Sequence, residues 1–508
     1  MRLISILNQM HRVRELAVIL VIIGFLAYLP SLFGGFVWDD EDFVYANNYV
    51  KEFRWEKFWT ENAIAGRGKN SNYYRPIQFT IYALIYKMAG PNPAVFHAVG
   101  IGLHVITAIT IIMVISVITN SSATGFLTAL FFLIHPLQTE SVSYISGHSD
   151  PLYALFFLLS LLFFLKRDER MLYKILSFVF FIISLLSKEL ALILPAVIIL
   201  IVLYERRHRR SGNGEAWFVV IFTAVALLYL VSRFTFLKFS DIALLWKGNP
   251  YGEHIIIRFA TFFKNFFMYL GLLIYPKDLF MERDSTVNIV TSLWSKWSFL
   301  FLFLNMVIVI TCFVHRNKER VRMAFFFWTA FLASFMPYTG IFLLNGILYE
   351  HYLYLPQVFF WASVFSLIPK LLKQLKYLKL LMIVLVVLYF VRSYVRQYDW
   401  IDSERFYRQT LSHAPKSVRI MNGLGMSLAE KGNCEEAIQV YKQASLLSPR
   451  TPNLYHNIAN CYLNMRQSDR AEKYYLKALE ADPSFSFSCA ALLKMGRSKS
   501  SCIMPQKY

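Results

Sequence analysis

Residues 16–42 read LAVILVIIGFLAYLPSLFGGFVWDDED, an apolar run that ends in four consecutive acids. The run from Leu16 to Phe33 approaches the ~20 residues that a helix needs to cross a bilayer core of roughly 30 Å. Basic residues precede it and no small-residue cleavage pattern follows it, so we expect an uncleaved first helix rather than a signal peptide. The four acids, residues 39–42, would then lie just beyond the membrane.

The rest of the chain has the same apolar character. Of its 508 residues, 56% are hydrophobic and only 17% are charged, whereas soluble domains carry about 25% charged residues. The further apolar runs are 99–118, 172–186, 190–204, 218–231, 299–314, 324–342 and 380–391. The five cysteines show neither metal-ligand nor disulfide spacing. We therefore predict an all-α, polytopic helical membrane protein.

The net charge of +20 would suit a nucleic-acid-binding protein, but the basic residues fall in short loops between the apolar runs. These loops are 11–14, 166–174, 205–210, 315–320 and 369–379. Because basic loops remain in the cytoplasm, the N-terminus is expected there and the acids after the first helix outside. The expected partner is thus the lipid bilayer and not nucleic acid, in an inner or plasma membrane if the protein is prokaryotic.

The segment 258–276 is apolar, but a single crossing there would invert every later loop. Arg258 and Lys264 fall within its first two turns, which favours an interfacial or re-entrant helix. With that assignment we expect about eleven spans and a C-terminal region outside the cytoplasm.

After about residue 399 the composition becomes polar and a 34-residue period appears. The recurring pairs are Ala437 and Ala471, Tyr441 and Tyr475, Ala444 and Ala478, and Pro449 and Pro483. A tetratricopeptide repeat has this period, with small residues where its helices touch and proline at the exit turn. We predict a membrane domain, 1–398, and a repeat domain, 399–508, with a half repeat 403–415, repeats 418–451 and 452–485, and a cap 486–500. Such a stack binds an extended peptide or protein in its concave face.

Polar residues collect in the loops on the predicted outer face, and such residues near a bilayer usually have a function. They are Asp39, Asp40, Arg75, His135, Glu140, His148, Asp150, Lys188, Glu189, Glu350 and His351. Each alone has an ordinary explanation, such as a solvated helix end. As a set from at least four loops, they suit transfer of a group from a lipid-linked phosphate. A carboxylate can take the proton of an acceptor hydroxyl, and Arg and Lys can stabilise the phosphate leaving group.

Six motifs occur in an order that is typical of one family. They are WDD (38–40), YYRP (73–76), FHAVGIGLH (96–104), HPLQTESVSYISGHSD (135–150), LLSKE (185–189) and YEHYLYLP (349–356). With these motifs and the C-terminal repeats, the chain resembles the transmembrane and tetratricopeptide-repeat-containing O-mannosyltransferases and their prokaryotic relatives. That family has the multi-spanning glycosyltransferase fold called GT-C.

The resemblance implies a polyprenyl-phosphate-linked sugar as donor and a protein hydroxyl as acceptor, with chemistry on the non-cytoplasmic side. The catalytic base is expected in the first loop, at Asp39 or Asp40, and we favour Asp40 slightly. The remaining positions implied to complete the site or to serve the donor phosphate and substrate are Arg75, His135, Glu140, His148, Asp150, Lys188, Glu350 and His351.

The sequence departs from the family pattern at three positions. The usual Gly-Arg-x-Asp reads Gly147-His148-Ser149-Asp150, the usual Glu-Arg reads Glu350-His351, and the usual Asn of the third motif is Gly100. Two arginines have thus become histidines, whose charge depends on pH near neutrality. We hypothesise that transfer weakens as the pH rises through their pKa values.

Other functions remain open from the sequence. A ligase or transferase acting on a glycan or lipid acceptor shares this chemistry, whereas a membrane-anchored repeat scaffold for envelope assembly needs no catalysis. A transporter would carry charges near the middle of its spans, which are nearly free of charge here. No cofactor is implied, although acids and histidines could hold a divalent metal.

Overall fold

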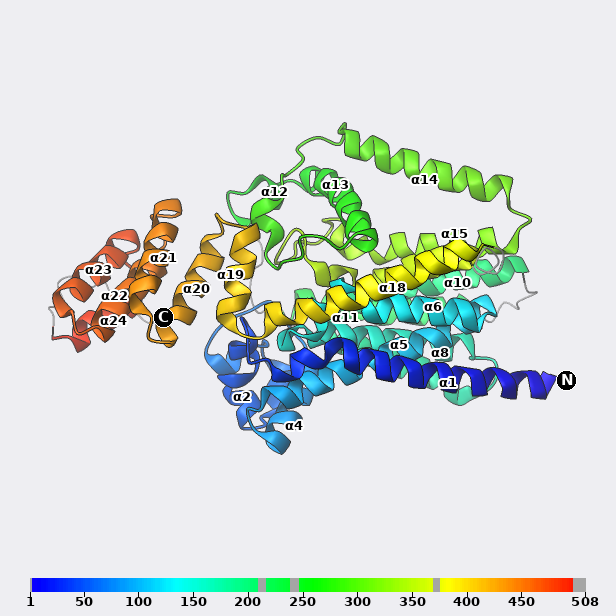
Figure 1. Ribbon diagram of the computed structural model, residues 1–508, viewed down its shortest axis with the longest axis horizontal. Coiled ribbons are helices and arrows are strands. Elements are labelled where there is room, and N and C mark those ends of the chain that lie inside the picture. The colour runs from blue at the N-terminus through cyan, green and yellow to red at the C-terminus, as the bar shows by residue number, and fades with distance from the viewer. Residues whose placement is uncertain (1, 209–215, 238–245, 369–374, 497–508) are drawn as a thin grey trace. The chain divides into compact units, whose positions relative to one another are not determined.

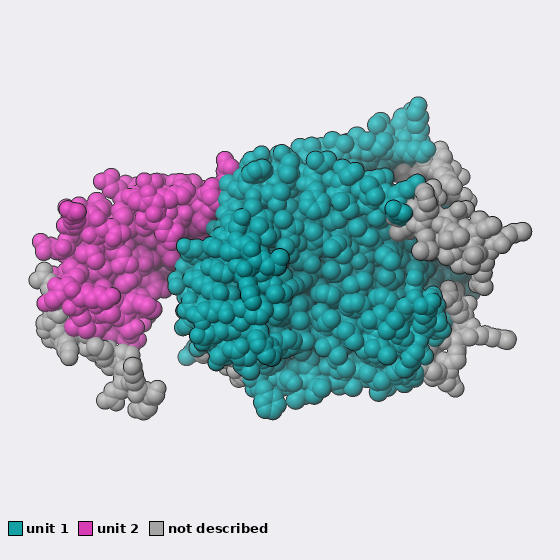
Figure 2. Space-filling model, turned by 90° about the horizontal axis from the view of Figure 1, so that it is seen from below, with its two compact units in different colours: residues 1–279, 287–401 teal, residues 280–286, 402–508 magenta. Residues whose placement is uncertain are grey.

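The computed structural model describes residues 2–208, 216–237, 246–368 and 375–496. Within these ranges the chain forms helices and no strand, which confirms the predicted all-α class. The chain divides into two compact units, Met1–Leu279 with Val287–Ile401 and Phe280–Thr286 with Asp402–Tyr508 (Figure 2). The main division after residue 401 lies close to the boundary expected after residue 398.

Several helices of the first unit are suited to a membrane. Seven described helices are long and apolar enough to cross one, by length and composition. Four of them are α5 (Pro93–Thr119), α11 (Ala216–Phe234), α13 (Ile255–Ile274) and α14 (Lys296–Val314) (Figure 1). The other three include an adjoining short helix: Arg14–Phe33 extends α1 (Arg2–Tyr28), Ile145–Leu165 contains α8 (Ser149–Leu165), and Lys376–Trp400 contains α18 (Lys376–Arg396). The shorter helices are α6 (Ser122–Ile134), α9 (Met171–Ser187), α10 (Leu194–His208), α15 (Glu319–Ser334) and α16 (Pro356–Leu367). The protein is therefore a multi-pass membrane protein, and the count of eleven spans stays a prediction.

The segment expected to be interfacial or re-entrant forms one unbroken helix, α13, of 20 residues. A re-entrant segment reverses direction within the bilayer, and α13 contains no such turn. Its length and composition are compatible with a crossing, and an interfacial position stays a prediction.

The helices of this unit differ in how much of their surface the protein covers. The apolar window of α8 is 78% buried and that of α5 is 61% buried, whereas that of α14 is only 6% buried. In a bilayer the uncovered apolar side chains of α14 face lipid. A buried histidine on α5 has two partners: His104 contacts the Tyr354 hydroxyl at 2.7 Å and the Leu133 carbonyl oxygen at 3.1 Å.

The first loop is a folded layer between α1 and α5. Its elements are η1 (Leu29–Phe33), the π-helix η2 (Glu41–Tyr45), α2 (Asn48–Lys51), α3 (Trp55–Thr60), η3 (Ala65–Arg67) and α4 (Pro76–Ala89) (Figure 1). Phe43, Val50, Phe58 and Phe79 form a buried apolar cluster under these helices. This apolar core fixes the backbone of the first loop, which carries the four acids.

The second unit contains two helical hairpins, α20 (Val418–Glu430) with α21 (Cys434–Leu447) and α22 (Pro452–Asn464) with α23 (Ser468–Ala481). Helix α19 (Ser403–His413) packs on α20, and α24 (Ser486–Lys494) packs on α23. A Cβ atom at Gly425 would lie 2.4 Å from Cε1 of Tyr441, which explains the small residue at this helix contact. Residues 497–500 of the expected cap lie outside the described residues.

Candidate active site

Asp40 joins the first loop to the second loop, residues 135–148, which lies between α6 and α8. Its side chain is 1% exposed and accepts three hydrogen bonds. The donors are the Val37 backbone N–H at 2.9 Å, the Ser146 backbone N–H at 2.7 Å and the Ser146 hydroxyl at 2.6 Å. Burial raises the pKa of Asp40 to about 7, although these hydrogen bonds oppose the shift. Oδ1 of Asp40 thus links the first loop to the second, whereas Oδ2 fixes the backbone of the first loop at Val37.

Asp39 precedes this anchor and is only partly buried. Trp38 before it has a φ of 57°, an unusual conformation for a bulky residue and one that occurs most often at functional sites. Burial raises the pKa of Tyr73, and the charges of Arg75 and Asp39 also act on this hydroxyl. The Tyr73 hydroxyl is therefore within electrostatic reach of both Arg75 and Asp39.

Arg75 lies in the first loop, directly before α4. It is 8% exposed, donates a hydrogen bond to the Ser149 hydroxyl at 3.1 Å, and lies 4.4 Å from the ring centroid of Tyr73. Its buried Nε has no hydrogen-bond partner. A buried guanidinium with an unused donor is suited to an anionic ligand, because Arg binds phosphate oxygens through such N–H groups.

Lys188 and Asp150 form a buried ion pair, with Nζ 2.7 Å from Oδ1 and side-chain exposures of 5% and 2%. Burial lowers the pKa of Lys188, and Asp150 partly offsets this effect. For the neighbouring Glu189, burial favours the neutral form, but Arg75 and Arg233 outweigh burial and the pKa is lowered. Each of these buried charges thus has an opposite charge that acts on it.

Glu140 connects the second loop to the late loop, which we define as residues 335–355 between α15 and α16. Its Oε2 accepts the backbone N–H of Glu350 at 3.1 Å, and its Oε1 lies 2.6 Å from Nδ1 of His351. Burial, followed by the positive charge of Lys188, lowers the pKa of His351 to about 3. His351 is therefore neutral at ordinary pH, and the expectation that it titrates near neutrality is wrong.

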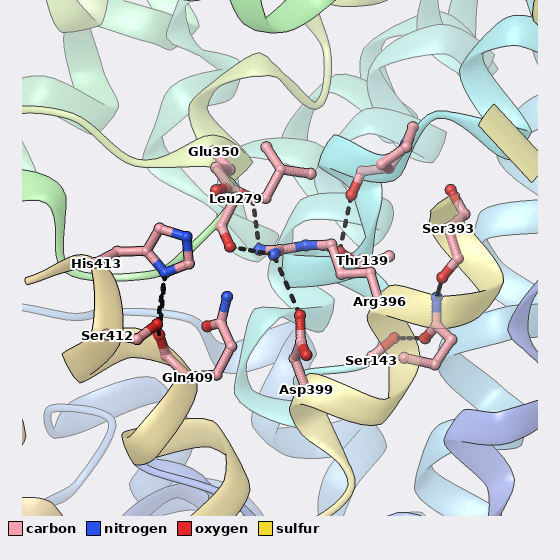
Figure 3. Close-up of polar contacts among 12 residues, drawn as sticks. Thr139, Ser143, Leu279, Glu350, Ser393, Arg396, Asp399, Gln409, Ser412 and His413 are labelled. Carbon is pink, nitrogen blue, oxygen red and sulfur yellow. Dashed lines mark hydrogen bonds and ion pairs between the residues drawn. The ribbon is translucent and has the colours of Figure 1, made fainter. Parts of the chain in front are cut away.

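Arg396, at the end of α18, is the partner of Glu350 (Figure 3). Its Nη2 lies 2.7 Å from Oε2 of Glu350, and both side chains are at most 1% exposed. We did not identify Arg396 from the sequence, where it is one of several basic residues at the end of an apolar run. An arginine close to the apolar part of a span was the one available signal, since such charges are rarely without function.

The rings of His135 and His148 bond to backbone groups. Nδ1 of His135 accepts the Leu137 backbone N–H at 3.3 Å, and its Nε2 bonds the Leu273 carbonyl oxygen at 3.0 Å. Nε2 of His148 bonds the Val142 carbonyl oxygen at 3.1 Å. Both rings are at most 1% exposed, so in this arrangement they support the backbone of the loops.

The structure brings most of the predicted residues into one group. Charges of Lys188, Asp150, Arg75 and Glu350 act on His351, and Arg75 also lies near Asp39 through Tyr73. The group therefore joins Asp39, Arg75, Glu140, Asp150, Lys188, Glu350 and His351. Among the described residues, no cluster of three or more His, Cys, Asp or Glu side chains could hold a metal ion.

Comparisons with known proteins agree with this organisation. The family model described as "Tetratricopeptide repeat" matches residues 452–485, and the one described as "TPR repeat" matches residues 425–465. Tetratricopeptide repeats near the C-terminus are thus confirmed, whereas the half repeat, the bounds of the first repeat and the cap stay predictions.

The larger part of the chain also has relatives. Protein O-mannosyl-transferase F38B6.6 of Caenorhabditis elegans is 24% identical over 445 residues, which cover 85% of this chain and 62% of that protein. The chain resembles the protein O-mannosyl-transferases. Protein O-mannosyl-transferase TMTC4 of Homo sapiens is 23% identical over 483 residues, covering 82% of this chain and 64% of that protein. The chain thus spans less than two thirds of the length of these O-mannosyl-transferases, and the resemblance inferred from its motifs is confirmed.

Proposed function

We propose that this protein is an integral-membrane glycosyltransferase. It would transfer a sugar from a polyprenyl-phosphate-linked donor to a serine or threonine hydroxyl of a protein on the non-cytoplasmic face. The observation that carries this proposal is the buried group of paired acids and cations drawn from separate loops, in a chain similar to O-mannosyl-transferases over most of its length. The repeats would hold the acceptor or a partner protein.

In this proposal Asp39 is the general base. A base must reach the hydroxyl whose proton it takes. Asp39 is partly exposed, whereas both oxygens of Asp40 accept hydrogen bonds from Val37 and Ser146. The geometry thus shifts our preference from Asp40 to Asp39 and gives Asp40 the role of holding Asp39 in place.

The transfer itself would be a displacement at the anomeric carbon of the sugar. The acceptor oxygen gives its proton to Asp39 and forms the new C–O bond, while the bond between the anomeric carbon and the phosphate oxygen breaks. The polyprenyl phosphate leaves as an anion. Arg75, with its unpartnered Nε, and Lys188 would stabilise that charge.

The test uses purified protein, a set of polyprenyl-phosphate sugars that includes the mannose form, and serine- or threonine-containing peptides, with mass spectrometry of the products. We expect transfer by the wild-type protein, loss of transfer in Asp39→Asn, and a folded Asp39→Asn protein by thermal unfolding. Absence of transfer with every donor would contradict the proposal. If Asp39→Asn keeps full transfer activity and Asp40→Asn loses it, Asp40 is the general base.

A scaffold without catalysis is the second candidate, because the family models that match the chain are those of the repeats. It predicts that Asp39→Asn and Arg75→Gln leave the protein's cellular role unchanged. Truncation after residue 401 would abolish that role.

A further inference from the structure

Arg396 contacts three separate segments of the first unit through different nitrogens (Figure 3). Nε donates to Oγ1 of Thr139 at 2.6 Å, and Nη1 donates to the carbonyl oxygen of Leu279 at 2.6 Å. Nη2 donates to Oε2 of Glu350 at 2.7 Å. The side chain is 1% exposed, so these contacts replace almost all of its hydration. The planar guanidinium thus fixes the relative positions of the three segments.

The next residue strengthens the same junction. Oε1 of Gln397 accepts hydrogen bonds from the hydroxyls of Ser31, at 2.5 Å, and Ser143, and its Nε2 donates to the Ser393 carbonyl oxygen at 2.9 Å. The residue directly after α18 therefore bonds to η1 and to the second loop at one place.

The contacts of Arg396 continue into the candidate active site. Glu350 bonds Arg396 through its side chain and Glu140 through its backbone N–H. Thr139, on Nε of Arg396, is the residue before Glu140. Arg396 thus holds both sides of the contact between Glu140 and the late loop.

Glu140 in turn orients His351. An ionised carboxylate only accepts hydrogen bonds, so the bond of 2.6 Å places the hydrogen of the neutral ring on Nδ1. Nε2 then points away from Glu140 with an unshared electron pair. The charged groups whose electrostatic effects reach this ring are Lys188, Asp150, Arg75 and Glu350, besides Glu140 itself. The side chain of His351 is 20% exposed, so a substrate hydroxyl could reach Nε2.

We propose that Arg396 is a positioning residue: through Glu350 and Thr139 it holds Glu140 and His351 so that Nε2 of His351 accepts a hydrogen bond from a substrate hydroxyl. This inference rests on the proposed glycosyl transfer. The hydroxyl belongs either to the sugar of the donor or to the acceptor side chain.

Stability alone does not account for this arrangement. Buried ion pairs are often no more stabilising than apolar residues of similar volume, because both charges lose their hydration. The guanidinium nevertheless bonds three segments at distances of 2.6 to 2.7 Å, a geometry that lysine cannot reproduce.

The experiment compares Arg396→Lys and Arg396→Gln with the wild-type full chain in kcat, in KM for donor and peptide, and in pH profile per folded molecule. The substrates are polyprenyl-phosphate mannose and a threonine peptide. Misplaced groups lower kcat, so we expect a loss of about 10²-fold in Arg396→Gln, and a smaller loss in Arg396→Lys, with little change in KM. In Arg396→Gln the unpaired Glu350 raises the pKa of His351, so the acidic side of the profile moves to higher pH; Arg396→Lys keeps the charge and the profile.

Arg167→Lys is the matched control. Arg167 is also buried and lies 2.7 Å from a carboxylate, Glu205, after the end of α8 that is remote from Asp150. We expect wild-type kcat for this variant. Mannose donors that each lack one hydroxyl identify the hydroxyl that His351 binds. If His351 binds the sugar, one of these donors gives an activity that no longer depends on His351, so His351→Phe has no further effect with it. If the acceptor is bound, no donor has this effect.

The possible outcomes separate the two proposals. Suppose that the wild-type protein is active and that the Arg396 variants unfold at a lower temperature but keep kcat and the pH profile per folded molecule. This result would overturn the positioning role. If neither Arg396 variant folds, Glu350→Gln gives the same test, because it removes the charged partner of Nη2. A wild-type protein that transfers no sugar would overturn the proposed function and this inference with it.

Discussion

Gly100 on α5 lies directly against the imidazole of His148. A Cβ atom at position 100 would be 2.2 Å from Nε2 of His148, well inside contact distance. The same nitrogen bonds the carbonyl oxygen of Val142. Two of the three departures from the family pattern, at positions 100 and 148, therefore occur at one contact: the absence of a side chain at one makes room for the ring at the other.

Gly100→Ala should destabilise the protein. The added methyl group displaces His148 or α5, and overpacking of this kind costs about 1–3 kcal/mol. Thermal unfolding in detergent measures the effect. Gly102→Ala is the matched control on the same helix, because a Cβ atom there meets nothing within 4 Å. A Gly100→Ala protein as stable as Gly102→Ala would contradict the packing described.

Asp40 should make the protein less stable as the pH rises. Burial raises its pKa to about 7 in the folded state, whereas an aspartate in an unfolded chain titrates near ~3.9. Between these values the folded state binds the proton and the unfolded state does not. The stabilisation by Asp40 is therefore complete below about pH 4 and decreases by about 1.4 kcal/mol per pH unit until pH 7.

Denaturant unfolding of wild type and Asp40→Asn between pH 4 and pH 7 tests this. The difference in unfolding free energy between the two proteins should change with pH, because asparagine does not titrate. A constant difference for Asp40→Asn would rule out the raised pKa.

The stability losses caused by substitutions at Lys188 and Asp150 should depend strongly on each other. Lys188→Met leaves a buried carboxylate without its cation, which costs about 3–5 kcal/mol. The double variant Lys188→Met with Asp150→Asn should lose much less than the sum of the single losses, as a double-mutant cycle of thermal unfolding would show. The exposed pair of Lys69 and Asp42 is the control, and Lys69→Met should cost at most about 1 kcal/mol. Additive losses at positions 188 and 150 would contradict the pairing.

The proposed orientation predicts opposite labelling of two exposed loop positions. Asn48 lies in the first loop and Asn317 in a basic loop between α14 and α15. With a membrane-impermeant maleimide on intact cells, Asn48→Cys should react and Asn317→Cys should react only after lysis. The wild-type chain, which keeps its own cysteines, gives the background. The reverse pattern would invert the topology and place the acids of the first loop in the cytoplasm.

Much of the architecture followed from local sequence features. Apolar runs long enough to span a bilayer can satisfy their backbone only as helices there, so the all-α membrane class required no tertiary information. The repeats were recognisable because a small residue recurs at one helix contact: Gly425 meets Tyr441 within one hairpin, and the sequence has Ala459 and Tyr475 at the same spacing 34 residues later. The loops carrying Asp39, Arg75, Lys188 and Glu350 were found by their motifs and their polarity.

The tertiary structure decided which residues of the site form hydrogen bonds and ion pairs with one another. Nothing in the sequence places Arg396 beside Glu350, 46 residues away, or separates Asp40, bonded to Ser146, from its neighbour Asp39. The charge state of His351 likewise depends on its burial and on Lys188, which belongs to another loop. Sequence sets which groups are available, whereas pKa values and hydrogen-bond partners depend on distance and desolvation, which exist only once the loops are packed together.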